Sequence, residues 1–221
     1  MDTVIFACKT LENELLSAAV ECECSYEIKW LESGLHNVTK KLTAALQALI
    51  DSSQEYSRAL LALGYCGNSL VGLHTGNLTL VVPRVDDCIS LLLGSYKNRQ
   101  ELTKNDYSYF MTEGWLKGER NIWREYEYAV SKFGEETGKD IYDAMFGHYK
   151  TLAMLNTNCF DLSYAEAEGK RIAAALGLEY KVIPATIGYI RQLLTGPWEN
   201  ESFLLIPPDS TIGIGDLTLP E

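Results

Sequence analysis

The stretch RALLALGYC, residues 58–66, sets the expectation for the fold. Its apolar part is short and continuous, and it ends at Gly64, where the chain can turn. Such a run, bounded by glycine, is typical of a fully buried strand in a parallel sheet. Cys66 follows this strand and stands between Gly64 and Gly67, so its thiol is expected to face whatever lies beyond the end of the sheet.

Similar apolar runs alternate with helical spacing along the chain. We predict strands at TVIFAC (3–8), YEIKWLES (26–33), LTLVVP (78–83), YSYFMT (107–112), TLAMLNT (151–157), YKVIPA (180–185) and SFLLIPP (202–208). We predict helices over 11–20, 36–51, 163–176 and 187–195, short helical segments near 68–74 and 87–94, and a long helical stretch over 119–146 that breaks near Gly134 and Gly138. This alternation predicts an α/β fold with a mainly parallel sheet and helices on both faces. Residues 1–221 form either one domain or two Rossmann-like lobes divided near 115–150.

Composition restricts the classes of function. The net charge is −11 and lysines and arginines do not cluster, which argues against a nucleic-acid partner. The apolar runs are far shorter than the roughly 20 residues that span a bilayer, and the first residues lack the basic region of a signal peptide. We therefore expect a cytoplasmic protein without a membrane partner. In that compartment its six cysteines are expected to be buried, metal-binding or catalytic rather than disulfide-bonded.

Three cysteines follow predicted strands. Cys8 ends TVIFAC, Cys66 ends RALLALGYC, and Cys88 follows LTLVVP at the start of a helical segment. Because the carboxyl ends of parallel strands meet at one edge, these thiols are expected to converge, with the strand before Cys8 adjacent to the strand before Cys66 or Cys88. A helix N-terminus favours the thiolate, which is the form that binds metals. The alternative is that each cysteine is a small buried hydrophobic residue.

Other residues are weaker candidates. Asp86, Asp87, His36 and Cys159 could supply a fourth ligand or a supporting contact, although one aspartate is better explained as a helix cap. Arg84 could bind a substrate carboxylate or phosphate, or pair with the two aspartates. Glu113 and Trp115 follow the fifth strand and could line a substrate pocket, but core packing explains the tryptophan equally well. Cys22 and Cys24 lie between a helix and a strand, where no pocket is expected.

The motifs FACKTL (6–11), LESGLH (31–36), GYCGNSLVGL (64–73) and PRVDDCISLLLG (83–94) resemble those of domain-of-unknown-function family 1638. The resemblance places the family's three cysteines on Cys8, Cys66 and Cys88, and some relatives have a histidine where this chain has Asp86. Family members come mainly from methanogens and other anaerobes, often beside genes for corrinoid-dependent methyl transfer. The resemblance therefore implies a link to anaerobic one-carbon or corrinoid metabolism, with a corrinoid protein or its methyltransferase as partner.

Three hypotheses about function follow. In the first, Cys8, Cys66 and Cys88 bind zinc or an iron–sulfur cluster and leave one coordination position open. In the second, the protein is a metal-free cysteine enzyme, racemase-like or nucleophilic, with Cys66 and Cys159 opposed across two halves and Arg84 binding a carboxylate. In the third, it is a non-catalytic accessory protein of a corrinoid methyltransferase system. The first is preferred because three thiols at equivalent strand ends suit one metal centre.

Overall fold

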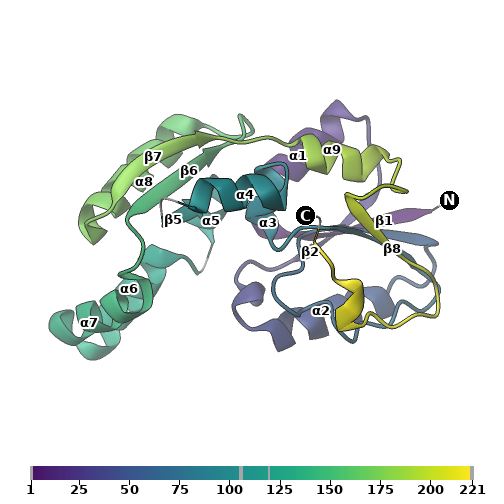
Figure 1. Ribbon diagram of the computed structural model, residues 1–221, viewed down its shortest axis with the longest axis horizontal. Coiled ribbons are helices and arrows are strands. Elements are labelled where there is room, and N and C mark those ends of the chain that lie inside the picture. The colour runs from purple at the N-terminus through teal and green to yellow at the C-terminus, as the bar shows by residue number, and fades with distance from the viewer. Residues whose placement is uncertain (1, 105–106, 119, 220–221) are drawn as a thin grey trace. The chain divides into compact units, whose positions relative to one another are not determined.

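The structure is a computed structural model that describes residues 2–104, 107–118 and 120–219 (Figure 1). The chain divides into two units. The first unit contains residues 1–100 and 185–221, and the second unit contains residues 101–184, so the second unit is an insertion in the chain of the first. No helix in the described part of the chain has both the length and the apolar character needed to cross a membrane.

The first unit is built on a five-stranded sheet. Its strand order is β2-β1-β3-β4-β8, with β1 (Thr3–Cys8), β2 (Glu27–Leu31), β3 (Arg58–Ala62), β4 (Thr79–Pro83) and β8 (Phe203–Ile206). The first four are parallel, and β8 pairs antiparallel with β4. Strand β1 is a neighbour of β3, the strand before Cys66, which is one of the two neighbours predicted for it. The predicted α/β fold with a mainly parallel sheet is therefore confirmed.

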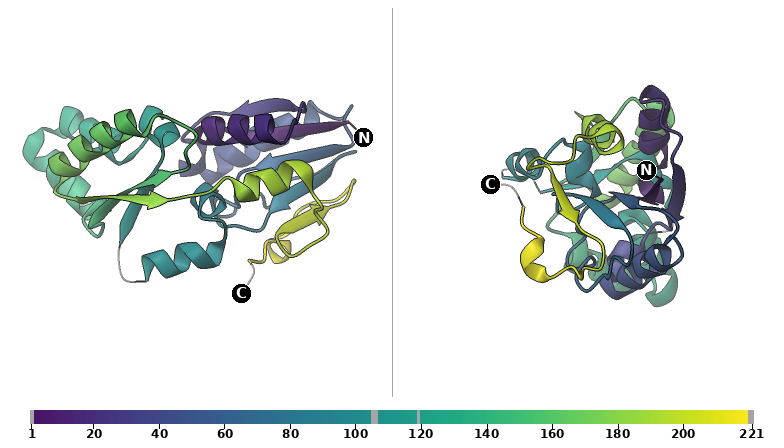
Figure 2. Two further views of the ribbon diagram at one scale, coloured as in Figure 1. Left: turned by 90° about the horizontal axis from the view of Figure 1, so that it is seen from above. Right: turned by 90° about the vertical axis from the view of Figure 1, so that its right-hand side faces the viewer.

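Helices cover both faces of this sheet. The helical elements are η1 (Lys9–Leu11), α1 (Glu12–Glu21), η2 (Leu35–Asn37), α2 (Thr39–Asp51), α3 (Cys88–Leu92), α9 (Gly188–Thr195) and η3 (Ile214–Asp216), with α4 (Tyr96–Thr103) at the boundary between the units. Strands β2 and β3 flank β1 on opposite sides, so right-handed crossovers place α1 and α2 on opposite faces. The end-on view in Figure 2 shows α1 and α9 on one face and α2 on the other.

From β1 the chain proceeds to β2 on one side, and it then returns across β1 to β3 and β4 on the other side. The strand order therefore reverses between β1 and β3. In open α/β sheets, ligands bind beyond the carboxyl ends of the strands at such a reversal. Central residues of these strands, such as Phe6 and Leu60, are fully buried, so the sheet itself is an apolar support. The edge formed by the ends of β1 and β3 is thus the position in this unit where a site is expected.

The segment after β3 differs from the prediction. Residues 68–74 form turns rather than a helix, and Gly67 and Gly72 take positive φ angles of 72° and 85°. Backbone hydrogen bonds join this segment to the C-terminal tail, from Gly72 N to Ile212 O (2.8 Å) and from Ile212 N to Leu73 O (2.9 Å). The helical spacing of Leu70 and Leu73 was misleading: both leucines are buried, but their segment hydrogen-bonds to the tail instead of forming a helix.

The second unit has a three-stranded parallel sheet of order β5-β6-β7. Its elements are β5 (Ser108–Met111), α5 (Glu113–Lys117), α6 (Ile122–Phe133), α7 (Glu135–Phe146), β6 (Thr151–Asn156), α8 (Leu162–Leu176) and β7 (Glu179–Pro184). Helix α8 packs on β6 and β7, and Met111, Leu152 and Ile172 belong to the core. This unit thus has a hydrophobic core of its own.

Helices α6 and α7 replace the predicted helical stretch over 119–146. Residue 119 lies outside the described residues, and Gly134 separates the two helices, with a φ of 84°. Gly138 does not break α7: it is the point of closest approach, where an added Cβ would lie 2.6 Å from the Cα of Val130. Asn121 caps α6 by accepting hydrogen bonds from the amides of Trp123 and Arg124, each at 3.0 Å.

Candidate functional site

Three thiols come together at the carboxyl edge of the first unit's sheet. Cys8 is the last residue of β1, Cys66 lies four residues beyond the end of β3, and Cys88 is the first residue of α3. The thiols of Cys8 and Cys66 both affect the pKa of Cys88, so the three side chains lie near one another. We call these three residues, with Cys88 in the middle, the thiol cluster. Cys88 is 5% exposed, and the other two are half-buried.

Backbone contacts beyond the strands bring Cys66 to Cys88. Tyr65 N donates to Val85 O at 2.9 Å, and Cys66 N donates to Asp86 O at 2.7 Å. These bonds extend the pairing of β3 and β4 into the two loops. Gly64 permits this approach, because an added Cβ would lie 2.5–2.7 Å from three backbone atoms of Asp87. Cys66 itself has a φ of 46°, a left-handed conformation that directs its side chain out of the normal strand alternation.

The electrostatics of the thiol cluster differ from the expectation of a helix-stabilised thiolate. The pKa of Cys8 is raised well above the ordinary 9.0. The largest cause is its interaction with the Cys88 thiol, and burial is the second. The pKa of Cys88 is also raised well above 9.0, first by its interaction with the Cys66 thiol. The first turn of the five-residue helix α3 does not offset these effects. Without a metal, these two thiols therefore keep their protons at neutral pH.

Cys8 has one further partner, the hydroxyl of Thr10, whose Oγ1 lies 3.0 Å from its sulfur. In the described residues as they stand, no three His, Cys, Asp or Glu side chains have the arrangement of a metal site. A metal would have to displace the protons of these thiols before it binds their sulfur atoms. The donor set itself, three soft sulfur atoms on neighbouring segments, is suited to zinc or to iron–sulfur clusters.

The two aspartates before Cys88 are engaged in structural contacts. Asp87 caps α3, and its Oδ1 accepts from the amides of Ile89 (2.9 Å) and Ser90 (3.2 Å). Asp86 accepts a short hydrogen bond from the Ser90 hydroxyl. Arg99 forms ion pairs with both carboxylates, at 3.3 Å to Oδ2 of Asp86. The capping interpretation of Asp87 agrees with this geometry, and Arg99 takes the pairing role that the sequence suggested for Arg84.

His36 lies in η2, at the same edge of the sheet, and is half-buried. Burial lowers the pKa of His36, and the charge of Asp87 opposes this shift. The interaction with Asp87 places the imidazole near the loop that carries Cys88. A neutral imidazole there could accept a proton or bind a metal, as the sequence suggested.

Arg84 is held by the C-terminal tail. Its Nη1 donates to Oγ1 (2.7 Å) and O (3.3 Å) of Thr218, and its Nε donates to Phe203 O at 3.3 Å. The hydroxyl of Tyr65 also donates to Thr218 O, at 3.1 Å. Arg84 therefore joins the tail to the residues that flank the thiol cluster. Binding of a substrate anion by Arg84 stays a prediction.

Cys22 and Cys24 lie apart from the thiol cluster. Helix α1 starts at the edge that carries Cys8 and ends at Glu21, so its ten residues carry Cys22 about 15 Å away along the helix axis. Burial raises the pKa of Cys22, and the backbone amide of Cys24 donates to Ala19 O at 2.9 Å. These contacts are those of a helix C-terminus.

Three predicted residues belong to the second unit. Glu113 is the first residue of α5 and pairs with Lys117 at 3.0 Å, and Trp115 packs against that unit's core. Cys159 follows β6, and its sulfur donates to the carbonyl of Thr157 at 3.4 Å. The hypothesis that opposes Cys159 to Cys66 stays a prediction.

Sequence reasoning missed three residues: Arg99, Glu14 and Thr10. Arg99 lies in the polar helix α4, which has no apolar stripe to mark it. Glu14, in the first turn of α1, is fully buried, although nothing in its neighbourhood in the sequence distinguishes it from exposed glutamates. Thr10 could have been found, because a hydroxyl two residues after a cysteine can reach its sulfur.

Fold and site together define an α/β protein with a thiol cluster at the switch point of a mainly parallel sheet. The chain belongs to the family described as Protein of unknown function (DUF1638), whose model matches residues 30–194. The matched range includes Cys66 and Cys88, whereas Cys8 precedes it. No curated protein and no solved structure matches the chain.

Proposed function

We propose that the thiol cluster binds one soft metal centre, either a zinc ion or an iron–sulfur cluster. The observation that supports this is the convergence of Cys8, Cys66 and Cys88 at one edge of the sheet, produced by the pairing of β1 with β3 and by the hydrogen bond from Cys66 N to Asp86 O at 2.7 Å. These three residues come from segments far apart in the sequence, so packing alone does not require their sulfur atoms to meet. Three thiolates would leave one coordination position for a substrate thiol, water or another ligand.

The protein's contribution is to hold three thiols and to control their protons. Raised pKa values keep Cys8 and Cys88 neutral in the metal-free protein, which avoids uncompensated buried charge. A bound metal would supply the positive charge that stabilises the thiolates, and the protons would be released to solvent. Arg99 pairs with both Asp86 and Asp87 and offsets one of their two negative charges, and the charge of Asp87 still helps to raise the pKa of Cys88.

The reaction that such a centre would serve is proposed from its chemistry. A zinc ion with an open position activates a bound thiol as a nucleophile, as transfer of a methyl group requires, and a cluster would transfer electrons instead. A role in anaerobic one-carbon metabolism with a corrinoid protein rests on the family resemblance and stays a prediction.

The test is the metal content of protein purified without oxygen, measured by elemental analysis together with the visible absorption spectrum. We expect about one zinc per chain without colour, or iron and sulfide with visible absorption. Cys66→Ser should lose the metal, while Cys24→Ser, a matched change of a half-buried cysteine outside the thiol cluster, should retain it. Metal-free wild-type protein, or equal metal in both variants, would reject the proposal and favour the metal-free enzyme or the accessory protein.

A further inference from the structure

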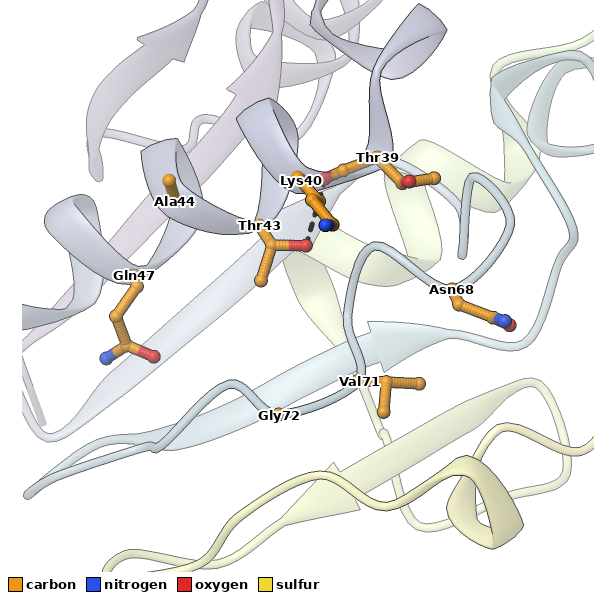
Figure 3. Close-up of a pocket in the computed structure, with 8 residues that line it drawn as sticks. All are labelled: Thr39, Lys40, Thr43, Ala44, Gln47, Asn68, Val71 and Gly72. Carbon is orange, nitrogen blue, oxygen red and sulfur yellow. Dashed lines mark hydrogen bonds between the residues drawn. The ribbon is translucent and has the colours of Figure 1, made fainter.

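A groove lies beside α2 in the first unit (Figure 3). It has a volume of about 500 Å³, within the range of about 300–1,000 Å³ typical of small-molecule sites. Helix α2 forms one wall and residues 68–72 form the other. The lining residues are Thr39, Lys40, Thr43, Ala44, Gln47, Asn68, Val71 and Gly72.

Hydrogen bonds join helix α2 to the loop that forms the other wall of the groove. Thr43 Oγ1 donates to Ser69 O at 2.7 Å. Gln47 binds the backbone of His74 twice: its Nε2 donates to the carbonyl at 3.0 Å, and its Oε1 accepts from the amide at 2.9 Å. Because these bonds fix the loop against the helix, the groove is formed before any ligand arrives, which lowers the entropic cost of binding.

The groove carries three polar side chains that can each donate a hydrogen bond to a ligand: Thr39, Lys40 and Asn68. Within the described residues, the side chains of Thr39, Lys40 and Asn68 make no hydrogen bond or ion pair with the protein. No aspartate or glutamate is among the lining residues, although the chain has a net charge of −11. The ammonium group of Lys40 and the neighbouring donors therefore favour an anion, whereas Ala44 and Val71 offer an apolar surface beside them.

One end of the groove adjoins the loop of the thiol cluster. Asn68 lies two residues after Cys66, and between them Gly67 faces Thr39, with an added Cβ 3.5 Å from the threonine methyl group. His36, which interacts with Asp87, lies three residues before Thr39. A ligand in the groove would thus lie along the segments that carry both the thiol cluster and the imidazole.

We propose that this groove binds a small organic anion, a carboxylate or a phosphate ester, whose charged group contacts Lys40, Thr39 and Asn68. Its apolar part lies over Ala44 and Val71. This inference names the substrate class for the proposed metal centre and to that extent rests on the proposed function, but anion binding itself does not require the metal.

The test is a titration of metal-free protein with sodium phosphate, acetate and butyrate at constant ionic strength, followed by amide chemical shifts in two-dimensional NMR. We expect saturable shifts at residues 39–44 and 68–72. Butyrate should bind more tightly than acetate if Ala44 and Val71 contact the chain, and a preference for phosphate over both would assign a phosphate ester. Lys40→Gln should weaken binding about tenfold, since it removes a charge-assisted hydrogen bond.

Lys41→Gln is the matched control, because Lys41 is the next residue of α2, equally exposed, and does not line the groove. Linear, unsaturated shifts, or equal weakening by both substitutions, would overturn the inference and indicate general attraction of anions to lysines. The experiments can reject the metal centre and the anion-binding groove independently of each other. Metal bound at the thiol cluster without saturable anion binding rejects only the groove, and anion binding in a protein that takes up no metal rejects only the metal centre.

Discussion

Replacing Gly64 with alanine should separate Cys66 from Cys88. An added Cβ would lie 2.5, 2.6 and 2.7 Å from the Cα, N and C atoms of Asp87, whereas ordinary contact begins at 3.4 Å. The two loops must therefore move apart by about 0.9 Å, and backbone atoms cannot rotate away as a side chain can. The hydrogen bonds of the Tyr65 and Cys66 amides, at 2.9 and 2.7 Å, would then exceed 3.5 Å.

The expected loss of stability follows from these contacts. Overpacking in a well-packed region costs about 1–3 kcal/mol, and each lost hydrogen bond costs about 1 kcal/mol. Gly64→Ala should therefore reduce the free energy of unfolding by about 3–5 kcal/mol, as measured by urea denaturation followed by circular dichroism. Gly215→Ala is the control, because no atom lies within 4 Å of its added Cβ.

Thiol cross-linking tests the local part of the prediction. Dibromobimane bridges two neighbouring thiols, and peptide mass spectrometry identifies the pair. In Gly64→Ala the Cys66–Cys88 product should fall more than the Cys8–Cys88 product, because Gly64 belongs to the loop that carries Cys66 and not to β1. An alanine variant with wild-type stability and an unchanged cross-linking pattern would refute the close approach of the two loops.

Three further predictions concern other contacts. Asn121, 4% exposed, caps α6, so Asn121→Ala should lower the free energy of unfolding by about 2 kcal/mol in urea denaturation. The Nδ2 of Asn121 also donates to Trp115 O at 2.9 Å, so the control is Asn121→Ser, which keeps a capping oxygen without adding a charge; it should lose less than alanine, and equal losses would contradict the capping role. Because the pKa of Cys88 is raised in the folded protein, its contribution to stability is present below pH 9 and is lost above it. The difference in unfolding free energy between metal-free wild type and Cys88→Ala should shrink as the pH rises above about 9, and a difference that does not change with pH would show that the pKa of Cys88 is not raised. The hydrogen bond to Glu27 raises the pKa of Tyr56 to about 12, so Glu27→Gln should lower it toward 10 in a tyrosine NMR titration, with no change if the bond is absent.

The fold was predictable where burial is encoded locally. The strands TVIFAC and RALLALGYC are continuous apolar runs, and β1 and β3 occupy these segments because a central parallel strand is buried on both faces. Residues 68–74 were not predictable in the same way. Their turns are hydrogen-bonded to a tail more than a hundred residues away in the sequence, and local sequence spacing does not reveal that contact.

The candidate site also has features that the sequence predicts and features that it does not. The proximity of Cys8 to the other thiols follows from the rule that parallel strands end at one edge. The protonation of Cys88 does not, because burial and neighbouring thiols outweigh the local effect of a short helix. Arg99 was also missed. Its ion pairs with Asp86 and Asp87 depend on the position of α4 in the folded protein, and no sequence motif indicates that position. The bound metal stays a prediction.

The antiparallel pairing of β8 with β4 has a consequence for synthesis of the chain. Strand β4 is complete at Pro83, but its partner β8 begins only at Phe203. While the ribosome makes the intervening residues, including the whole second unit, the apolar strand β4 has an open hydrogen-bonding edge. Nascent chains halted before residue 203 should therefore be more prone to aggregate, or to bind chaperones, than chains released just after residue 206.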